Sequence, residues 1–165
     1  MDDPHASPPD PSLPLRETDR HVIGWREYVA FPEWGIRHLR AKTDTGARTS
    51  AIDAYDIEEL PGGMVRFTVA ASRKHPERRH EVTAPITRRT HVKSSMGHKH
   101  DRLFVTVTMK VGPVTKPIEV GLVSRHKMVC RMLIGRAALE GDFLVDPQRE
   151  LLLTRKPKRR PKPKP

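Results

Sequence analysis

Residues 41–50 read AKTDTGARTS, and the Asp-Thr-Gly-Ala within this stretch decides the fold that we expect. An apolar pattern containing Ile36, Leu39 and Ala41 precedes it, which is typical of a strand that leads into a turn. An aspartate on such a turn can lie beside a second aspartate, and two carboxyl groups that share one proton supply a general base and a general acid. The triplet Asp-Thr-Gly occurs once in the chain. A complete site of this kind therefore needs two copies of the chain.

The residues around the key aspartate, Asp44, suit a loop whose backbone must not drift. Thr45 offers a hydroxyl that can bind a neighbouring backbone group, Gly46 permits close approach or a positive φ, and Ala47 leaves space beside the carboxylate. Other aspartates could be proposed as the second carboxylate within one chain, but none is followed by Thr-Gly: Asp53, Asp56, Asp101 and Asp146. We therefore expect a homodimer in which Asp44 of each subunit meets its copy on a two-fold axis.

Short β-prone runs with turn residues between them fill the centre of the chain, which predicts an all-β domain. Three hairpins are expected, from residues 23–31 with 36–43, from 51–57 with 64–70, and from 103–111 with 114–123. The third has the clearest alternation of apolar and polar residues, and Gly112-Pro113 supplies its turn. A weaker strand is expected at 80–87 and one short helix around 136–140, and residues 143–145 and 151–154 then close the domain.

A second block, RMLIGR at residues 131–136, is an apolar strand that ends in glycine at the start of the short helix. Together with residues 44–47 it resembles the retropepsin half-site, in which an apolar-apolar-Gly strand passes behind the aspartate loop. The resemblance implies a closed retropepsin-like (acid protease) β-barrel with one short helix and one half-site per chain. It makes Asp44 the catalytic residue and gives loop-supporting roles to Thr45, Gly46, Ala47, Leu133, Ile134, Gly135 and Arg136.

A closer resemblance covers roughly residues 22–153. Seven blocks in order are similar to the bacterial retropepsin-like proteins labelled "ATP-dependent zinc protease", which are associated with ATP-grasp glutamate ligases. The blocks are residues 23–27, 41–51, 65–67, 92–95, 97–98, 131–136 and 143–147. This resemblance implies an aspartic endopeptidase with a functional link to such a ligase.

The zinc and ATP of that label have no matching motif in this chain. A His-Glu-x-x-His helix and a Gly-rich phosphate loop with Lys-Ser/Thr are both missing from the sequence. Five histidines do gather between residues 75 and 100, and His98 and His100 could share one face of a strand. They are interpreted as solvated loop residues, or as a substrate contact, rather than as zinc ligands. We expect catalysis without a metal or a cofactor.

Arg48 departs from the retroviral pattern, which places an acidic residue after Asp-Thr-Gly-Ala to pair with the arginine of the Gly-Arg block. Arg136 must therefore find another partner. The net charge is +11, with −3 in residues 1–20 and +7 in 155–165, so residues 21–154 carry +7. A basic domain with Arg48 near the site favours acidic peptides. The alternative is that Arg48 forms a structural ion pair with Glu27 or Asp53.

Residues 88–102 are polar and rich in histidine and serine. Retropepsins fold a mobile hairpin over the substrate, and this segment is the candidate for that flap. The substrate-binding residues expected here are Ser94, Ser95, Gly97 and His98. An ordinary surface loop is the alternative.

The two ends of the chain cannot form a core and are predicted to be disordered. Residues 1–20 are rich in proline and acids, and residues 155–165 contain only Lys, Arg and Pro. The domain is thus expected at residues 21–154. The basic tail is either a solubilising appendage or a weak non-specific tether to nucleic acid.

The cysteine content, the hydrophobic runs and the aromatic residues bear on where the protein works and what it binds. Cys130 is the only cysteine, and no run of about 18 apolar residues could span a membrane. A soluble cytoplasmic protein is expected. Four aromatic residues are too scattered to stack on nucleic-acid bases and are assigned to the core: Trp25, Phe31, Trp34 and Phe67.

The sequence as a whole predicts an aspartic-type peptide-bond hydrolase that acts as a homodimer on acidic or glutamate-rich peptides or glutamate-modified proteins. The alternative is a non-catalytic module of the same fold that binds acidic peptides or regulates a glutamate ligase.

Overall fold

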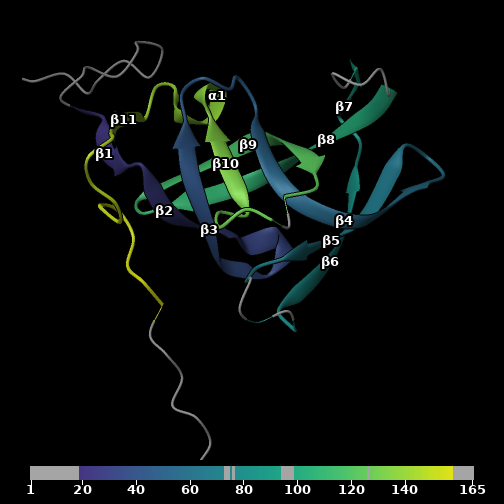
Figure 1. The fold of residues 1–165 in the computed structure, drawn as a ribbon, viewed down its shortest axis with the longest axis horizontal. Helices are drawn as coiled ribbons and strands as arrows, with labels where there is room; N and C mark the ends of the chain where they lie inside the picture. The colour runs from purple at the N-terminus through teal and green to yellow at the C-terminus, as the bar shows by residue number, and fades with distance from the viewer. Residues whose placement is uncertain (1–18, 73–74, 76, 94–98, 126, 158–165) are drawn as a thin grey trace, which may run out of the picture.

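Six strands close into a barrel in the computed structural model of the chain (Figure 1). The structure describes residues 19–72, 75, 77–93, 99–125 and 127–157. The barrel strands are β2 (Arg26–Phe31), β3 (Ile36–Asp44), β4 (Ser50–Leu60), β8 (Lys99–Val111), β9 (Val114–Val123) and β10 (Met132–Gly135). Each strand pairs with the next in the ring β10-β3-β2-β8-β9-β4, and β4 pairs with β10 to close it. The predicted closed all-β barrel is confirmed.

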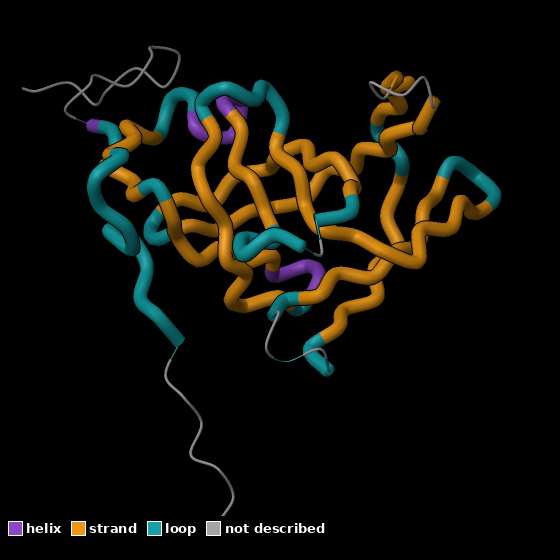
Figure 2. Tube along the Cα trace, in the orientation of Figure 1, coloured by secondary structure: helices purple, strands orange, loops and turns teal. Residues whose placement is uncertain are grey.

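The remaining strands extend this barrel or lie beside it. β5 (Met64–Ala70) and β6 (Arg79–Pro85) continue from β4, and β7 (Arg88–Lys93) pairs with β8. β1 (His21–Gly24) and β11 (Phe143–Asp146) form a separate parallel pair. The β4–β5 and β7–β8 hairpins project on the side away from β1 and β11 (Figure 2). Two short helical segments complete the described fold, the 3-10 turn η2 (Pro32–Trp34) and the helix α1 (Arg136–Leu139).

The three predicted hairpins are present. β2 pairs with β3, β4 with β5, and β8 with β9, all in antiparallel register. The alternation expected in β8 is also found, because its inward-facing residues are all buried: Leu103, Val105, Val107 and Met109. Period-two burial on one face of each strand therefore builds the core.

The aromatic residues follow the core assignment with one exception. Phe31 and Phe67 are fully buried, and the half-buried Trp34 packs against both rings. Trp25 is 38% exposed, so its assignment to the core was wrong. It lies in the bend between β1 and β2, which breaks the alternation, and the guanidinium of Arg26 stacks 4.9 Å from its ring centroid.

Glu27 is a fully buried carboxylate on the core side of β2. It accepts hydrogen bonds from the backbone N–H groups of Gly24 (3.1 Å), Leu152 (2.8 Å), Leu153 (3.2 Å) and Thr154 (3.1 Å), and from the Thr154 hydroxyl (2.5 Å). Residues 151–154 thus pack against the barrel without forming a strand. One side chain fastens the segment that follows β11 to the beginning of the fold.

Replacement of Glu27 by alanine is expected to destabilise the protein by about 3–5 kcal/mol, because several donors would lose their acceptor and each buried unsatisfied donor costs about 1–3 kcal/mol. Urea unfolding followed by circular dichroism measures this loss. Glu58→Ala is the matched control, because Glu58 forms a solvent-exposed ion pair with Arg66 and such pairs contribute little to stability. Equal losses from the two substitutions would contradict the assigned role of Glu27.

Candidate active site

Asp44 is the last residue of β3, and its carboxylate is oriented by its own loop. Oδ1 accepts hydrogen bonds from the backbone N–H groups of Gly46 and Ala47, each at 3.1 Å. The side chain is half-buried, whereas Thr45 and Gly46 are exposed. Oδ2 has no hydrogen-bond partner among the residues that the structure describes. One carboxylate oxygen is thus fixed by the loop, and the other is left for a further partner.

The carbonyl groups of this loop are held by the beginning of α1. Arg136 donates from Nη1 to the carbonyl oxygens of Thr45 (3.0 Å) and Gly46 (3.1 Å), and from its backbone N–H to that of Ala47 (2.8 Å). The backbone N–H of Ala137 binds the carbonyl oxygen of Arg48 at 3.0 Å. Four consecutive carbonyls are thus bound by two residues. Arg136 uses backbone oxygens where the retroviral pattern has an acidic side chain.

β10 passes directly behind the loop, with Gly135 in register with Asp44. A Cβ atom on Gly135 would lie 2.5 Å from the backbone carbon of Thr49 and 2.8 Å from the carbonyl oxygen of Arg48, so only glycine fits. The preceding residues Leu133 and Ile134 pair with β3, and Ile134 is fully buried. The tips of β3 and β10 lie together beside α1 (Figure 1).

Ser50 is a supporting residue that the sequence reasoning missed. The residue is 2% exposed, and its hydroxyl accepts a hydrogen bond from the backbone N–H of Gly135 at 3.0 Å. A polar residue at the first core-facing position after the loop was the available signal. The hydroxyl of Thr45, by contrast, forms no hydrogen bond within the described part of the chain. Within one chain, Arg136 therefore holds the loop and Ser50 holds the end of β10 behind it.

Arg48 is exposed and forms no ion pair with any described residue. The alternative pairing with Glu27 or Asp53 was wrong. Glu27 is occupied by backbone donors, and Asp53 is buried against Arg131 (2.5 Å) and the backbone N–H of Arg125 (2.5 Å). The guanidinium of Arg48 is therefore available to a ligand.

The other candidate aspartates lie elsewhere in the fold, and two of them contact basic side chains. Asp101 contacts His91 at 2.6 Å, Asp146 pairs with Arg149 at 2.7 Å, and Asp56 lies in the irregular part of β4 with a φ of 51°. Within the described ranges no second carboxylate pairs with Asp44. This leaves one half-site per chain.

A cavity of about 400 Å³ opens beside the loop. It is lined by residues 48–50, 117–119 and 137–138 and by Arg88. These come from the segment after Asp44, from β9, from α1 and from the start of β7. The cavity thus adjoins the segment that directly follows the aspartate loop and carries arginine side chains in its wall.

The candidate flap is a hairpin at its base, because β7 pairs with β8 from Arg88 opposite Phe104 to Lys93 opposite Lys99. The four residues assigned to substrate binding within it, Ser94, Ser95, Gly97 and His98, lie outside the described residues.

Among the histidines that are described, none belongs to a group of three residues able to hold a metal.

Cys130 is buried just before β10, and burial raises the pKa of its thiol. The thiolate is the nucleophilic form of cysteine. A buried and protonated thiol fits a packing role.

No helix in the part of the chain that is described has the length and apolar character needed to cross a bilayer.

A closed six-stranded barrel that carries one Asp-Thr-Gly loop, backed by an Ile-Gly strand and a short helix, is the architecture of a retropepsin-like half-site. The chain belongs to the RimB-like family, whose model, described as "Retropepsin-like aspartic endopeptidase RimB", matches residues 22–156.

Curated relatives carry a different name. A probable alpha-L-glutamate ligase of Shewanella pealeana is 30% identical over 141 residues, which cover 84% of this chain and 31% of that protein. A probable alpha-L-glutamate ligase of Desulfotalea psychrophila is 32% identical over 136 residues, which cover 78% of this chain and 28% of that protein. The chain thus matches less than a third of these ligases.

A solved structure has the same fold. A Legionella pneumophila protein of unknown function superposes with a TM-score of 0.67 at 23% identity, covering 81% of this chain and 98% of that one.

Gly135→Ala is expected to loosen the aspartate loop, because the added methyl group would meet backbone atoms that cannot move aside without displacing β10 or the loop. We expect the amides of Arg136 and Ala137, which bind the loop carbonyls, to exchange with solvent at least about 10-fold faster by NMR. Gly63→Ala is the control, because it strains a φ of 72° with no atom within 4 Å. Unchanged exchange in Gly135→Ala would contradict the role of this close approach.

Proposed function

We propose that the protein is an aspartic endopeptidase that acts as a homodimer, with one Asp44 from each subunit. The observation that carries this proposal is the Asp44 carboxylate, which is held by two backbone N–H groups on a loop whose carbonyls are bound by α1. One carboxylate of such a pair activates water, and the other, protonated, donates to the carbonyl oxygen of the scissile amide. Fixed carboxyl positions suit this shared-proton chemistry, which requires no metal.

The second subunit supplies what a single chain lacks. Thr45 and Gly46 are exposed, and the hydroxyl of Thr45 is available to a neighbouring backbone. Closed two-fold dimers bring identical surfaces together, so this exposed loop would meet its own copy. Two half-sites would thereby form one dyad.

Acidic peptides are the substrates that the charges favour. Arg48 lies beside the cavity without an ion pair to a described residue, and residues 21–154 carry a net charge of +7. Guanidinium groups bind carboxylates through two parallel hydrogen bonds. The relatives named as glutamate ligases support a link to glutamate-elongated proteins, which a peptidase of this kind would cleave.

A non-catalytic module is the second candidate. The chain matches only part of proteins named as ligases, which is compatible with a unit that binds the acidic product or regulates such an enzyme. It differs from the peptidase in one outcome: acidic peptides would be bound and never cleaved.

The cytoplasmic location and the weak binding of nucleic acid by the basic tail stay predictions.

Asp44→Asn is expected to lower peptide hydrolysis by at least about 10²- to 10⁴-fold, the usual contribution of a general acid or base. The amide oxygen of asparagine can still accept the N–H groups of Gly46 and Ala47, so the fold should be retained. Mass spectrometry of a glutamate-elongated protein and of unmodified peptides measures the loss. Asp56→Asn is the control, and full activity of purified Asp44→Asn would refute the proposal.

Subunit mixing tests whether two chains share the dyad. When wild-type protein exchanges subunits with an equal amount of Asp44→Asn, we expect activity to fall to about one half of that of the wild-type protein alone, because random pairing leaves fewer wild-type dimers. A ninefold excess of the variant should lower it to about one tenth on the same argument. Activity that is insensitive to the variant would show that each chain acts alone.

A further inference from the structure

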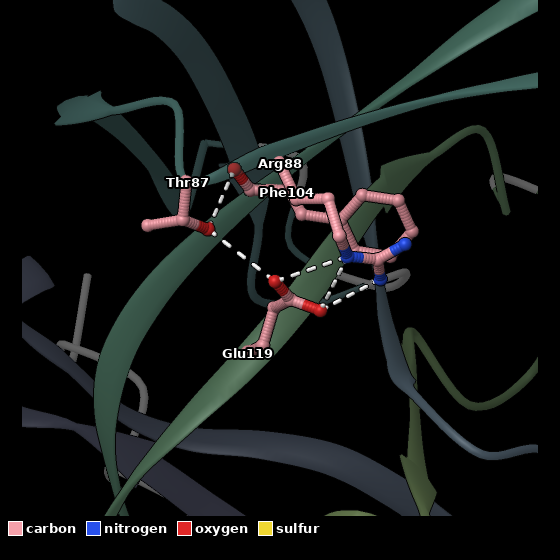
Figure 3. Close-up of polar contacts among 4 residues, drawn as sticks. All are labelled: Thr87, Arg88, Phe104 and Glu119. Carbon is pink, nitrogen blue, oxygen red and sulfur yellow. Dashed lines mark hydrogen bonds and ion pairs between the residues drawn. The ribbon is translucent and has the colours of Figure 1, made fainter.

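Arg88 is held rigidly in the wall of the cavity (Figure 3). Its Nε lies 3.1 and 3.3 Å from the two carboxylate oxygens of Glu119, and its Nη2 lies 2.7 Å from one of them. The guanidinium carbon lies 3.6 Å from the ring centroid of Phe104, which is itself buried. The hydroxyl of Thr87 donates to the carbonyl oxygen of Phe104 at 3.2 Å. An ion pair and a stacking contact thus fix one guanidinium.

A fixed arginine is well suited to recognise a ligand. A long flexible side chain loses rotamer entropy when it binds, and Arg88 has already lost much of that freedom to Glu119 and Phe104. Its third nitrogen, Nη1, has no hydrogen-bond partner among the residues that are described, and Figure 3 shows it free of dashed lines. The group therefore retains N–H donors for an incoming acceptor.

The charges of the cavity wall are complementary to a single carboxylate. Two arginines, Arg48 and Arg88, face one acid, Glu119, and no other lining residue is ionisable, so the wall carries a net charge of +1. The rest of the lining includes Ile118 and Ala138, which can contact methylene groups. One negative charge on a short aliphatic stem would neutralise the cavity and fill its apolar part.

We propose that this cavity is the subsite for a glutamate side chain of the peptide, and that Arg88 is its specificity-determining residue, with Arg48 as the second cation. The proposal rests on the proposed function for the nature of the ligand. It adds to that function the place on the protein that would select a glutamate over an uncharged side chain. Glu119 has the role of positioning residue, because its carboxylate holds the guanidinium of Arg88 over Phe104.

Binding is tested without turnover in the Asp44→Asn protein, with pairs of peptides that differ only by Glu or Gln at one position. We expect the Glu peptide to bind about 10- to 100-fold more tightly at the position that occupies the cavity, the range for a hydrogen bond to a charged group. When Arg88→Ala is combined with Asp44→Asn, we expect this preference to disappear. The affinity for the Gln peptide should stay within about threefold of that of the Asp44→Asn protein. Arg88→Lys should restore only part of it, because lysine lacks the planar pair of donors.

Two further variants separate contact from general charge. Arg88→Gln with Glu119→Gln leaves the net charge of the cavity at +1 but removes the guanidinium, and we expect it to lose the Glu preference as fully as Arg88→Ala does. Arg66→Ala removes an arginine outside the cavity that also pairs with a glutamate, and we expect it to leave the preference for the Glu peptide unchanged. Retained preference in the double variant, or equal losses for Glu and Gln peptides, would overturn the assignment of Arg88.

The same peptides, incubated with protein that retains Asp44, distinguish the two proposals. Preference for Glu that depends on Arg88, without any cleavage, would support the subsite and refute the peptidase. Cleavage with no dependence on Arg88 would support the peptidase and refute the subsite.

Discussion

The close approach of β10 to the aspartate loop is the constraint on which the site depends. Because Gly135 has no side chain, its backbone can pass within van der Waals contact of Arg48 and Thr49. This places the first turn of α1 where it binds four loop carbonyls, and it sets Asp44 beside donors that orient its carboxylate. The proposed peptidase would need this carboxyl group in position before the substrate arrives, and the backbone of the loop gives it a fixed position.

Local patterns in the sequence were sufficient for the three hairpins, although the run at residues 23–31 is divided by the bend at Trp25. The alternation in residues 103–111 and the Gly112-Pro113 turn specify the β8–β9 hairpin without help from distant residues. The insertion of β10 between β3 and β4 closes the barrel, and it was expected only through resemblance to a family whose strand passes behind the loop. Barrel closure joins residues far apart in the chain, so periodicity alone does not encode it.

Single polar residues were harder to predict. Glu27 binds donors that lie 125 to 127 residues away, and nothing near it in the sequence indicates those partners. That is why a pairing with Arg48 was a reasonable alternative and was wrong. The Arg88–Glu119 pair likewise joins positions 31 residues apart across β7 and β9. Ion pairs depend on tertiary contacts, whereas turns and strands follow from short-range chemistry.

The proposed function requires that Asp44 belong to a site made by two chains, and the distance between the two Asp44 carboxyl groups is a direct test of this requirement. A crystal structure of the purified protein would give this distance. We expect a two-fold dimer in which the nearest carboxyl oxygens lie about 3 Å apart, close enough to share a proton. Asp44 loops that face away from each other, with their carboxyl groups more than about 6 Å apart, would contradict it.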